Sequence, residues 1–351
     1  MRRDSIRLLA VGALLLLGAC ATTPAAGPSW SIALHGGAGV ISRSDMNPEA
    51  EASYRASLSA ALEAGAGVLR GGGSALDAVE TSVRLMEDDP NFNAGRGAVF
   101  TADGKNDLDA SIMDGRMRSA GAVAGMRTTR HPISAARAVM EKSSHVMLAG
   151  AGADAFAAEQ GLEQVAPAYF FTEHRWRQLE QELRRRNAAI PMRPEGAAPR
   201  PVQGATDLHD HQFGTVGVVA RDRAGNVAAG TSTGGTTAKR WNRIGDSPII
   251  GAGTYAQNGV CAVSSTGTGE FFIRLSAARE VCALIEHRRM SVQAAADKVV
   301  HEELPAIGGD GGVIAMDGAG RLAFSLNTSG MFRARVADGE TPVVHIYADE
   351  E

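Results

Sequence analysis

The sequence predicts an α+β protein in which helices lie outside antiparallel sheets. The chain has 351 residues, 44% of them hydrophobic, which is enough for a substantial core. Two pairs of short apolar runs are joined by turn-forming residues at 223–226 and 317–320, which predicts two β-hairpins. Segments with helical spacing of apolar residues lie apart from these hairpins. Hairpins make antiparallel sheet, and helices segregated from them pack against it as separate layers.

Six segments carry a helical pattern. Residues 51–69 are alanine-rich, with Leu58, Leu62 and Leu69 at helical spacing. Ser74 precedes the next segment and is suited to cap it, because its hydroxyl accepts a hydrogen bond from the first turn. The segment at 271–287 is expected to be buried. The helices are expected at residues 51–69, 74–87, 132–142, 153–163, 173–186 and 271–287.

Short apolar runs that end at glycine or aspartate predict the strands. Aromatic residues make up only 5% of the chain, so the core must be built from alanine, valine, leucine and isoleucine. Strands are expected at residues 31–35, 98–101, 216–221, 226–233, 312–316 and 321–326.

Charge, glycine and cysteine content exclude several classes of protein. The 35 basic and 39 acidic residues give a net charge of −4, and no long basic run occurs, which disfavours a nucleic-acid partner. The 42 glycines follow no Gly-X-Y period, which excludes collagen. Three cysteines cannot make a disulfide scaffold. Cys261 and Cys282 are compatible either with a disulfide in an oxidising compartment or with buried thiols.

The first 19 residues have the features of an export signal. A basic start is followed by an apolar run at 8–19, too short to span a bilayer but suited to a signal peptide. The end of this run, Leu17-Gly18-Ala19-Cys20, resembles the bacterial lipoprotein box, in which the cysteine is lipidated after cleavage. Ordinary signal cleavage next to Ala21 is the alternative. We therefore expect a signal peptide at 1–19, a tether at 20–30 and a periplasmic protein anchored to the envelope through Cys20.

Residues 187–213 differ in composition from their surroundings. They hold four of the 13 prolines and few aliphatic side chains, which is typical of a mobile linker. A segment dense in glycine and threonine starts directly after the linker, at Gly214 and Thr215.

Two short motifs match known sites but lack the context that those sites need. Residues 230–234 match G-x-S-x-G, yet no convincing helix follows to complete a nucleophile elbow. Residues 150–155 match the loose dinucleotide pattern G-x-G-x-x-A, but hairpins elsewhere argue against a doubly wound sheet. A tight turn into a helix is the expected structure there. No zinc motif is present in the sequence, and a catalytic zinc site is not expected.

Residues 214–269 combine the groups that acyl transfer requires. Such a site needs a nucleophile, a neighbour that orients it, and donors for a developing oxyanion. Arg243 and Asp246 lie within the segment, and this pair suits a zwitterion, with arginine for a carboxylate and aspartate for an ammonium group. The hydroxyl groups come from Thr215, Thr231, Thr233, Thr236, Thr237, Thr254, Thr266 and Thr268.

Several longer motifs occur along the chain. Within the glycine- and threonine-rich segment they lie at 214–217, 231–235, 243–253 and 265–270. Outside that segment they lie at 35–39, 72–79, 92–97, 108–115 and 327–332. In sequence and in order these motifs resemble those of the plant-type asparaginase/isoaspartyl peptidase family of N-terminal-nucleophile hydrolases. The resemblance covers about residues 31 to 333. Asn242 stands where the family more often has glycine.

This resemblance implies a four-layer αββα sandwich and an activation step. The chain would cut itself between Gly214 and Thr215, which frees the α-amino group of Thr215. A free α-amine has a pKa of about 7.7–8.0 and can act as a base near neutral pH without a histidine. We expect one domain at 31–351, divided into an α chain (20–214) and a β chain (215–351), with two αβ units pairing.

The family's roles can be carried over to matching residues. Thr215 is the expected nucleophile and Thr233 its orienting neighbour. Thr266 and the Gly267 N–H form the expected oxyanion hole. Asn93 supports the site from the other chain.

The substrate and ion sites follow from the same resemblance. Arg243 would hold the substrate α-carboxylate and Asp246 its α-ammonium group. No cofactor is expected to be required, but the family binds a structural sodium ion through backbone carbonyls. The backbone groups expected to approach the substrate belong to Gly235, Thr266, Gly267, Thr268 and Gly269. The carbonyls expected at the sodium ion belong to Met86, Glu87, Asp89, Phe92, Ala94 and Arg96.

The implied function is hydrolysis of the side-chain amide of L-asparagine and of β-aspartyl (isoaspartyl) dipeptides. One alternative is an aspartylglucosaminidase-like hydrolase. The resemblance implies the dipeptide Asp-Thr at the cleavage site of those enzymes, whereas this chain has Gly214-Thr215 there. The other alternative is a non-enzymatic envelope lipoprotein that keeps the fold as a binding module. The expected partners are a small amino-acid or dipeptide substrate and a second αβ unit.

Overall fold

The computed structural model describes residues 27–197 and 214–350. The expected signal peptide, Cys20, the first part of the tether and most of the linker lie outside the described residues. Among the helices that are described, none is both long and apolar enough to cross a membrane.

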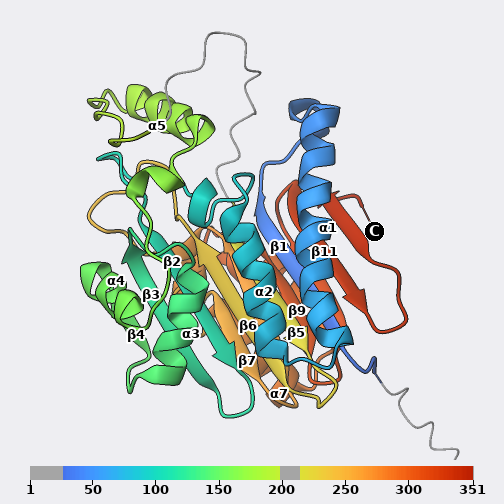
Figure 1. Ribbon diagram of the computed structural model, residues 1–351. Coiled ribbons are helices and arrows are strands. Elements are labelled where there is room, and N and C mark those ends of the chain that lie inside the picture. The colour runs from blue at the N-terminus through green and yellow to red at the C-terminus, as the bar shows by residue number, and fades with distance from the viewer. Residues whose placement is uncertain (1–26, 198–213, 351) are drawn as a thin grey trace, which may run out of the picture.

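Two sheets form the centre of the molecule (Figure 1). The larger has eight strands in the order β12-β11-β1-β5-β6-β2-β3-β4, and the smaller has four in the order β10-β9-β8-β7. Every pairing between neighbours is antiparallel except that of β3 with β4. The strands are β1 (Ser31–Gly39), β2 (Leu108–Asp114), β3 (Ser119–Met126), β4 (Met147–Ala149), β5 (Val216–Arg221), β6 (Val227–Thr233), β7 (Thr254–Gln257), β8 (Cys261–Gly267), β9 (Gly311–Asp317), β10 (Leu322–Leu326), β11 (Gly330–Ala337) and β12 (Val343–Tyr347).

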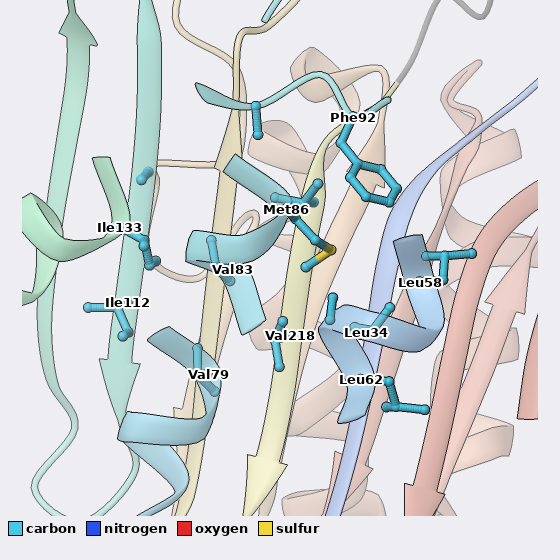
Figure 2. Packing of buried hydrophobic residues seen from close by; sticks show 14 of the residues in the cluster. Leu34, Leu58, Leu62, Val79, Val83, Met86, Phe92, Ile112, Ile133 and Val218 are labelled. Carbon is cyan, nitrogen blue, oxygen red and sulfur yellow. The ribbon is translucent and has the colours of Figure 1, made fainter. Parts of the chain in front are cut away.

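The sheets pack face to face, and helices cover their outer faces. Along β1, Ala33 belongs to the core between the sheets, whereas Ile32 and Leu34 belong to the core under the helices. Figure 2 shows the outer core, where Leu58, Leu62, Val79 and Val83 lie against the large sheet. The helices on this side are α1 (Pro48–Arg70), α2 (Ala75–Asp88) and α3 (Pro132–Lys142).

On the far side, α7 (Ala277–Arg288) and α8 (Val292–Asp297) pack on the small sheet through Val281 and Ala295. The layers therefore follow the order αββα, which confirms the expected fold. The remaining helical segments are α4 (Gly150–Glu159), α5 (Glu173–Arg185), α6 (Gly269–Leu275), α9 (Leu304–Ala306), three short 3-10 helices (Arg43–Asp45, Gly95–Gly97 and Pro167–Phe170) and a π-helix (Lys298–Glu303).

Most expected helices are present, with two changes. The Ser74 side chain accepts a hydrogen bond from Asp77 N, which confirms the expected cap. The segment expected at 153–163 begins earlier, at Gly150. The helix expected at 271–287 is two helices, α6 and α7, because Ser276 between them takes a left-handed conformation (φ 50°).

The strand expected at 98–101 is wrong. This segment is a loop whose backbone groups bond to side chains and to other loops and not to a strand: Val99 N donates to Asn93 Oδ1, Asn106 Nδ2 donates to Ala98 O, and Ala238 N donates to Phe100 O. Both expected hairpins are confirmed, since β5 pairs with β6 and β9 pairs with β10. Cys261 and Cys282 form a disulfide that links β8 to α7, with 5.6 Å between their Cα atoms.

Candidate active site

Thr215 and Thr233 meet at one edge of the large sheet. Thr215 directly precedes β5 and Thr233 ends β6, in a register that pairs Val216 with Ser232. The two threonine hydroxyl oxygens lie 3.0 Å apart. Thr233 Oγ1 also accepts a hydrogen bond from Gly235 N (3.0 Å), which leaves its own proton available for Thr215. The predicted nucleophile and its predicted neighbour are therefore in contact.

His35 holds the main chain of Thr215. Its Nδ1 lies 2.9 Å from the Thr215 carbonyl oxygen and its Nε2 lies 2.8 Å from Ser264 Oγ. Complete burial lowers the pKa of His35 to about 3, so the ring is neutral. A carbonyl oxygen only accepts, so Nδ1 carries the proton and Nε2 accepts from Ser264. This role was missed from the sequence, where the histidine was only part of a matching motif.

A chain of buried hydroxyl groups continues from Ser264 between the sheets. Ser264 Oγ lies 2.8 Å from Thr231 Oγ1, which lies 2.6 Å from Thr254 Oγ1. Ser111 Oγ follows at 2.8 Å and donates to the carbonyl oxygen of Ser247. The network ends one residue after Asp246 and so connects the nucleophile to the loop expected to bind substrate.

Asn93 joins the loop after α2 to both sides of the Gly214–Thr215 bond. Its backbone N donates to Gly214 O (3.1 Å), and its backbone carbonyl accepts from Gly234 N. Its side-chain Nδ2 donates to Gly235 O at 2.7 Å. Three hydrogen bonds thus hold this asparagine against the residues next to the two threonines, and a fourth, from Val99 N, fixes its side-chain oxygen.

Thr266 and Gly267 lie at the end of β8, in the neighbouring sheet. Thr266 Oγ1 accepts from Ala38 N (3.2 Å), so its hydroxyl proton is free to donate to another oxygen. Gly267 has a φ of 153°, and a Cβ there would collide with the Asp310 carbonyl. Gly267 lines the same small hollow as Thr215, Thr233, Gly235, Arg243 and Asp246.

Thr268 and Gly269 differ from the other predicted backbone contacts. The Thr268 hydroxyl donates to Asp310 Oδ1 (2.6 Å), and the residue does not line the hollow. Gly269 supports the hollow from behind, because a Cβ there would lie 2.8 Å from Asp246 N and 3.0 Å from Arg243 Nη2. Only a glycine lets α6 begin so close to both side chains.

Arg243 and Asp246 present opposite charges to the hollow. Arg243 donates from Nε and Nη2 to the two carboxylate oxygens of Glu270, both at 2.9 Å. Asp246 is 4% exposed, and its Oδ2 is buried without a hydrogen-bond partner among the described residues. Burial raises the pKa of Asp246 to about 7. Such a carboxylate is stabilised by a ligand that brings a cationic donor.

The hollow itself is small in the uncut chain. It measures about 10 Å³, and Gly214 forms part of its wall. Gly37 (φ 113°) packs behind this residue, since a Cβ at Gly37 would lie 2.5 Å from Gly214 Cα. Displacement of Gly214 would therefore enlarge the hollow.

The G-x-S-x-G match has a structural explanation. Ser232 Oγ is buried and donates to Glu87 Oε1 (2.6 Å), on the face opposite to the hollow. Ile133 N donates to the same carboxyl oxygen, and burial raises the pKa of Glu87 to about 8. Loop residues, not a helix, follow β6, as expected from the sequence.

The chain matches one family of known proteins over nearly its full length. A family model described as "Asparaginase" matches residues 28–346. The isoaspartyl peptidase of Salmonella typhimurium is 48% identical over 318 residues, which cover 91% of this chain and 98% of that protein. The isoaspartyl peptidase of Escherichia coli is 49% identical over 319 residues (91% and 96%). A probable isoaspartyl peptidase/L-asparaginase of Arabidopsis thaliana is 43% identical over 314 residues (87% and 94%).

Proposed function

The chain belongs to the asparaginase family, and we propose that it is a self-activating amidohydrolase for L-asparagine and β-aspartyl dipeptides. The observation that carries this proposal is the contact between the hydroxyl groups of Thr215 and Thr233 beside Arg243 and Asp246. A hydroxyl nucleophile, an orienting hydroxyl and a pair of opposite charges suit the side-chain amide of an α-amino acid. The relatives named above carry isoaspartyl peptidase and asparaginase names, which supports this branch of the family.

Activation would begin with attack of Thr215 Oγ on the carbonyl carbon of Gly214. The C–N bond breaks, the nitrogen takes up a proton, and an ester joins Gly214 to the Thr215 side chain. Water then hydrolyses this ester and leaves the α chain (20–214) and the β chain (215–351). The hydrogen bond from Asn93 N to the Gly214 carbonyl oxygen polarises the bond that is attacked.

Turnover would use the new α-amino group of Thr215 as its base. The amine takes the hydroxyl proton while Oγ attacks the side-chain carbonyl of the substrate, and Thr233 orients Oγ. The oxyanion is stabilised by the Thr266 hydroxyl and the Gly267 N–H. The ammonium group then protonates the departing amine or ammonia, and water releases aspartate from the ester.

The decisive experiment is intact-mass measurement and N-terminal sequencing of the purified protein. We expect two chains, one of which begins at Thr215, and a single chain from Thr215→Ala. A wild-type chain that stays uncut on incubation would refute the mechanism. Rates on asparagine, a β-aspartyl dipeptide and an N-glycosylated asparagine then test the substrate class. Preference for the glycosylated substrate would instead favour the aspartylglucosaminidase branch.

We also propose that a sodium ion stabilises the loop after α2. The ligands would be the main-chain carbonyls of the six residues expected from the sequence. Two glycines support this site, because a Cβ at Gly95 would collide with the Glu87 carbonyl oxygen and one at Gly97 with that of Phe92. Carbonyl oxygens are suitable ligands for such a hard cation. Replacing sodium by tetramethylammonium should lower the melting temperature, and an unchanged value would contradict the site.

We propose that the protein is exported and that two αβ units pair. The Cys261–Cys282 disulfide supports an oxidising compartment such as the periplasm. Lipid attachment at Cys20 predicts uptake of labelled fatty acid that is lost in Cys20→Ala. Pairing predicts twice the mass of one αβ unit in light scattering, and the mass of a single unit would contradict it.

A further inference from the structure

A buried ion pair lies beside the catalytic hollow and has no role in the mechanism above. Lys239 follows β6 in the loop that leads to Arg243, and Asp109 is in β2; they are 5% and 1% exposed. Lys239 Nζ lies 3.7 Å from Asp109 Oδ2 and donates to the main-chain oxygen of Asp107 at 2.9 Å. Neither member of the pair lines the hollow. Removing two charges from water costs about as much as their attraction returns, so such a pair favours a role other than stability.

Gly235 shows how close the Lys239 ammonium group comes to the hollow. Gly235 lines the hollow and its backbone N donates to Thr233 Oγ1. A Cβ at this glycine (φ 78°) would lie 3.0 Å from Lys239 Nζ and 3.5 Å from Arg243 Nη1. The ammonium and guanidinium groups therefore flank the same residue of the wall, and a side chain there would displace one or both of them.

The guanidinium group of Arg243 has one nitrogen left for a substrate. Its Nε and Nη2 donate to Glu270. Its Nη1 has no hydrogen-bond partner in the part of the chain that the structure describes, and it lies near Gly235 and Gly245, which both line the hollow. An N–H group of this kind forms a charge-assisted hydrogen bond with a carboxylate. Nη1 is thus the atom placed to bind the substrate α-carboxylate.

Asp109 is an internal competitor for this nitrogen. It lies directly opposite Thr233 across β6 and β2. Burial raises the pKa of Asp109, and the positive charges of Lys239 and Arg243 act in the opposite direction. The carboxyl group of Asp109 is therefore close enough to interact with both cations. Without Lys239, the guanidinium group would be left as a cation for this buried carboxylate, whose charge would also repel a substrate carboxylate.

The loop that carries Lys239 depends on a few polar anchors. Ala238, Trp241 and Asn242 have φ values of 57°, 56° and 53°, a left-handed conformation that is unfavourable for residues with a Cβ. Trp241 is 93% exposed, so packing does not hold the tip of the loop. Ala102 N donates to the Lys239 carbonyl oxygen, and the Lys239 side chain ties the loop to the residues at the start of β2.

We propose that Lys239 is a positioning residue for substrate binding, whose ammonium group neutralises Asp109 and so keeps Arg243 available for the substrate α-carboxylate. The inference rests on the function proposed above and deepens it, because it adds to the substrate site a residue that never touches the substrate. The pair does not contact Thr215, so its loss should affect binding of the substrate and not the chemical step.

The test uses Lys239→Met, Asp109→Asn and the two changes together. Methionine keeps the length of the lysine side chain without its charge, and asparagine keeps an oxygen that can accept from Gly125 N as Asp109 does. Lys239→Met should raise KM for asparagine roughly tenfold with kcat little changed, because the substrate then meets the charge of Asp109. Asp109→Asn alone should not raise KM, because Lys239 then has no charge to neutralise.

The double variant decides between a role of the charge and a merely structural role. Lys239→Met leaves a buried carboxylate uncompensated and is expected to be the least stable of the three variants. Removal of both charges should return KM for asparagine to within about threefold of the wild type, because the two changes are coupled. If Lys239→Met does not fold, the other two variants still decide, since both must bind asparagine nearly as the wild type does.

A second substrate separates the carboxylate from the rest of the molecule. In L-asparagine α-amide a neutral carboxamide replaces the α-carboxylate, so Lys239→Met should change its KM little. The matched control is Lys298→Met, which removes an exposed ion pair with Glu302 and should leave both KM values unchanged. An equal rise in KM for asparagine and its α-amide, no rise in a folded Lys239→Met, or a high KM that persists in the double variant would overturn the proposal.

Failure of the proposed function would look different. A wild-type enzyme that cleaves asparagine while the variants depart from this pattern removes the role of Lys239 and leaves the amidase activity. A wild-type enzyme that cleaves neither asparagine nor a β-aspartyl dipeptide removes the proposed function, and the role of Lys239 with it.

Discussion

The carbonyl oxygen of Thr215 and Nδ1 of His35 form a 2.9 Å hydrogen bond that ties the residue before β5 to β1. After the proposed cleavage Thr215 would have no upstream chain to hold it. This bond and the contact with Thr233 are then the polar anchors of the nucleophile that the structure records.

His35→Ala is expected to destabilise the protein and to lower kcat. The change leaves the buried Thr215 carbonyl oxygen without the His35 hydrogen bond, at about 1–3 kcal/mol, whereas Ser264 Oγ loses His35 but keeps its contact with Thr231 Oγ1. Urea unfolding and asparagine turnover measure the two effects. The control is His287→Ala, at an exposed histidine with a side chain 64% accessible. Equal unfolding curves for wild type and His35→Ala would show that the bond contributes nothing.

Thr233→Val keeps the shape of the side chain and removes its hydroxyl. Because the lost bond orients the nucleophile, we expect kcat to fall by roughly tenfold, or about 1.4 kcal/mol, with KM nearly unchanged. Thr233→Ser should recover most of the rate. Steady-state kinetics on asparagine distinguishes this from a binding defect, which would raise KM instead.

Asp246 predicts a pH-dependent KM. Its pKa of about 7 means that the carboxylate is protonated as the pH falls below 7, and the neutral form attracts the substrate ammonium group less. KM for asparagine should therefore rise as the pH is lowered from 8 to 6. In Asp246→Asn we expect a high KM that does not vary over this range, and a KM that still rises at low pH would assign the effect to another group.

The Asp246 carboxyl group also makes the stability of the fold depend on pH. Whereas low pH should weaken substrate binding, it should favour the folded state. The native pKa of Asp246 lies above the ordinary unfolded value of about 3.9, so between pH 4 and 7 the folded state binds more protons. Its contribution to stability is present at low pH and is lost as the pH rises towards 7. Asp246→Asn should raise the melting temperature more at pH 8 than at pH 5, and an equal change at both would contradict this.

The disulfide between Cys261 and Cys282 should stabilise the small-sheet side of the molecule. It closes a loop with a sequence separation of 21, for which loss of chain entropy predicts about 3 kcal/mol. Urea unfolding with and without reductant should show this difference, and the Cys261→Ser/Cys282→Ser double variant should not respond to reductant. Coincident curves for the wild type would mean that the bond adds no stability.

Gly269→Ala tests the close packing behind Arg243 and Asp246. The added methyl group would lie 2.8 Å from Asp246 N, so the substrate-binding loop must shift. We expect KM to rise for asparagine and dipeptide alike, with self-cleavage retained. Gly67→Ala is the control, because its nearest contact is 4.0 Å away. Unchanged KM in Gly269→Ala would show that the loop adapts without cost.

The residues that line the hollow could be predicted to lie together because they occur in contiguous motifs. Thr233, Arg243 and Asp246 occur within one glycine- and threonine-rich segment, and the structure brings all three to the hollow with Thr215. His35 could not be assigned a role, because its partners Thr215 and Ser264 are 180 and 229 residues away along the chain and no local pattern shows that they meet. Buried histidines and aspartates have many structural uses, so only the position of such a residue in the fold shows which role it has.

Several strands were missed for a related physical reason. Both faces of the large sheet are buried, so β3 shows no alternation of apolar and polar residues and is built from alanine, glycine and valine.

The departure from the family pattern at Asn242 has a local explanation in the backbone. Its φ of 53° explains a position where the family more often has glycine, since asparagine tolerates this left-handed conformation better than most residues.

Strands from the two sides of the Gly214–Thr215 bond are interleaved in the large sheet. β1 lies between β11 and β5, and β6 lies between β5 and β2 (Figure 1). The proposed cut would therefore break the covalent chain without separating the molecule, and the Cys261–Cys282 bond, with both cysteines in the proposed β chain, would not be what holds the two parts together. Two halves synthesised separately would have to insert β1 into a sheet that is already paired. Under the proposed cleavage, synthesis as one polypeptide would solve this assembly problem, and the appearance of a Thr215 N-terminus would report that folding is complete.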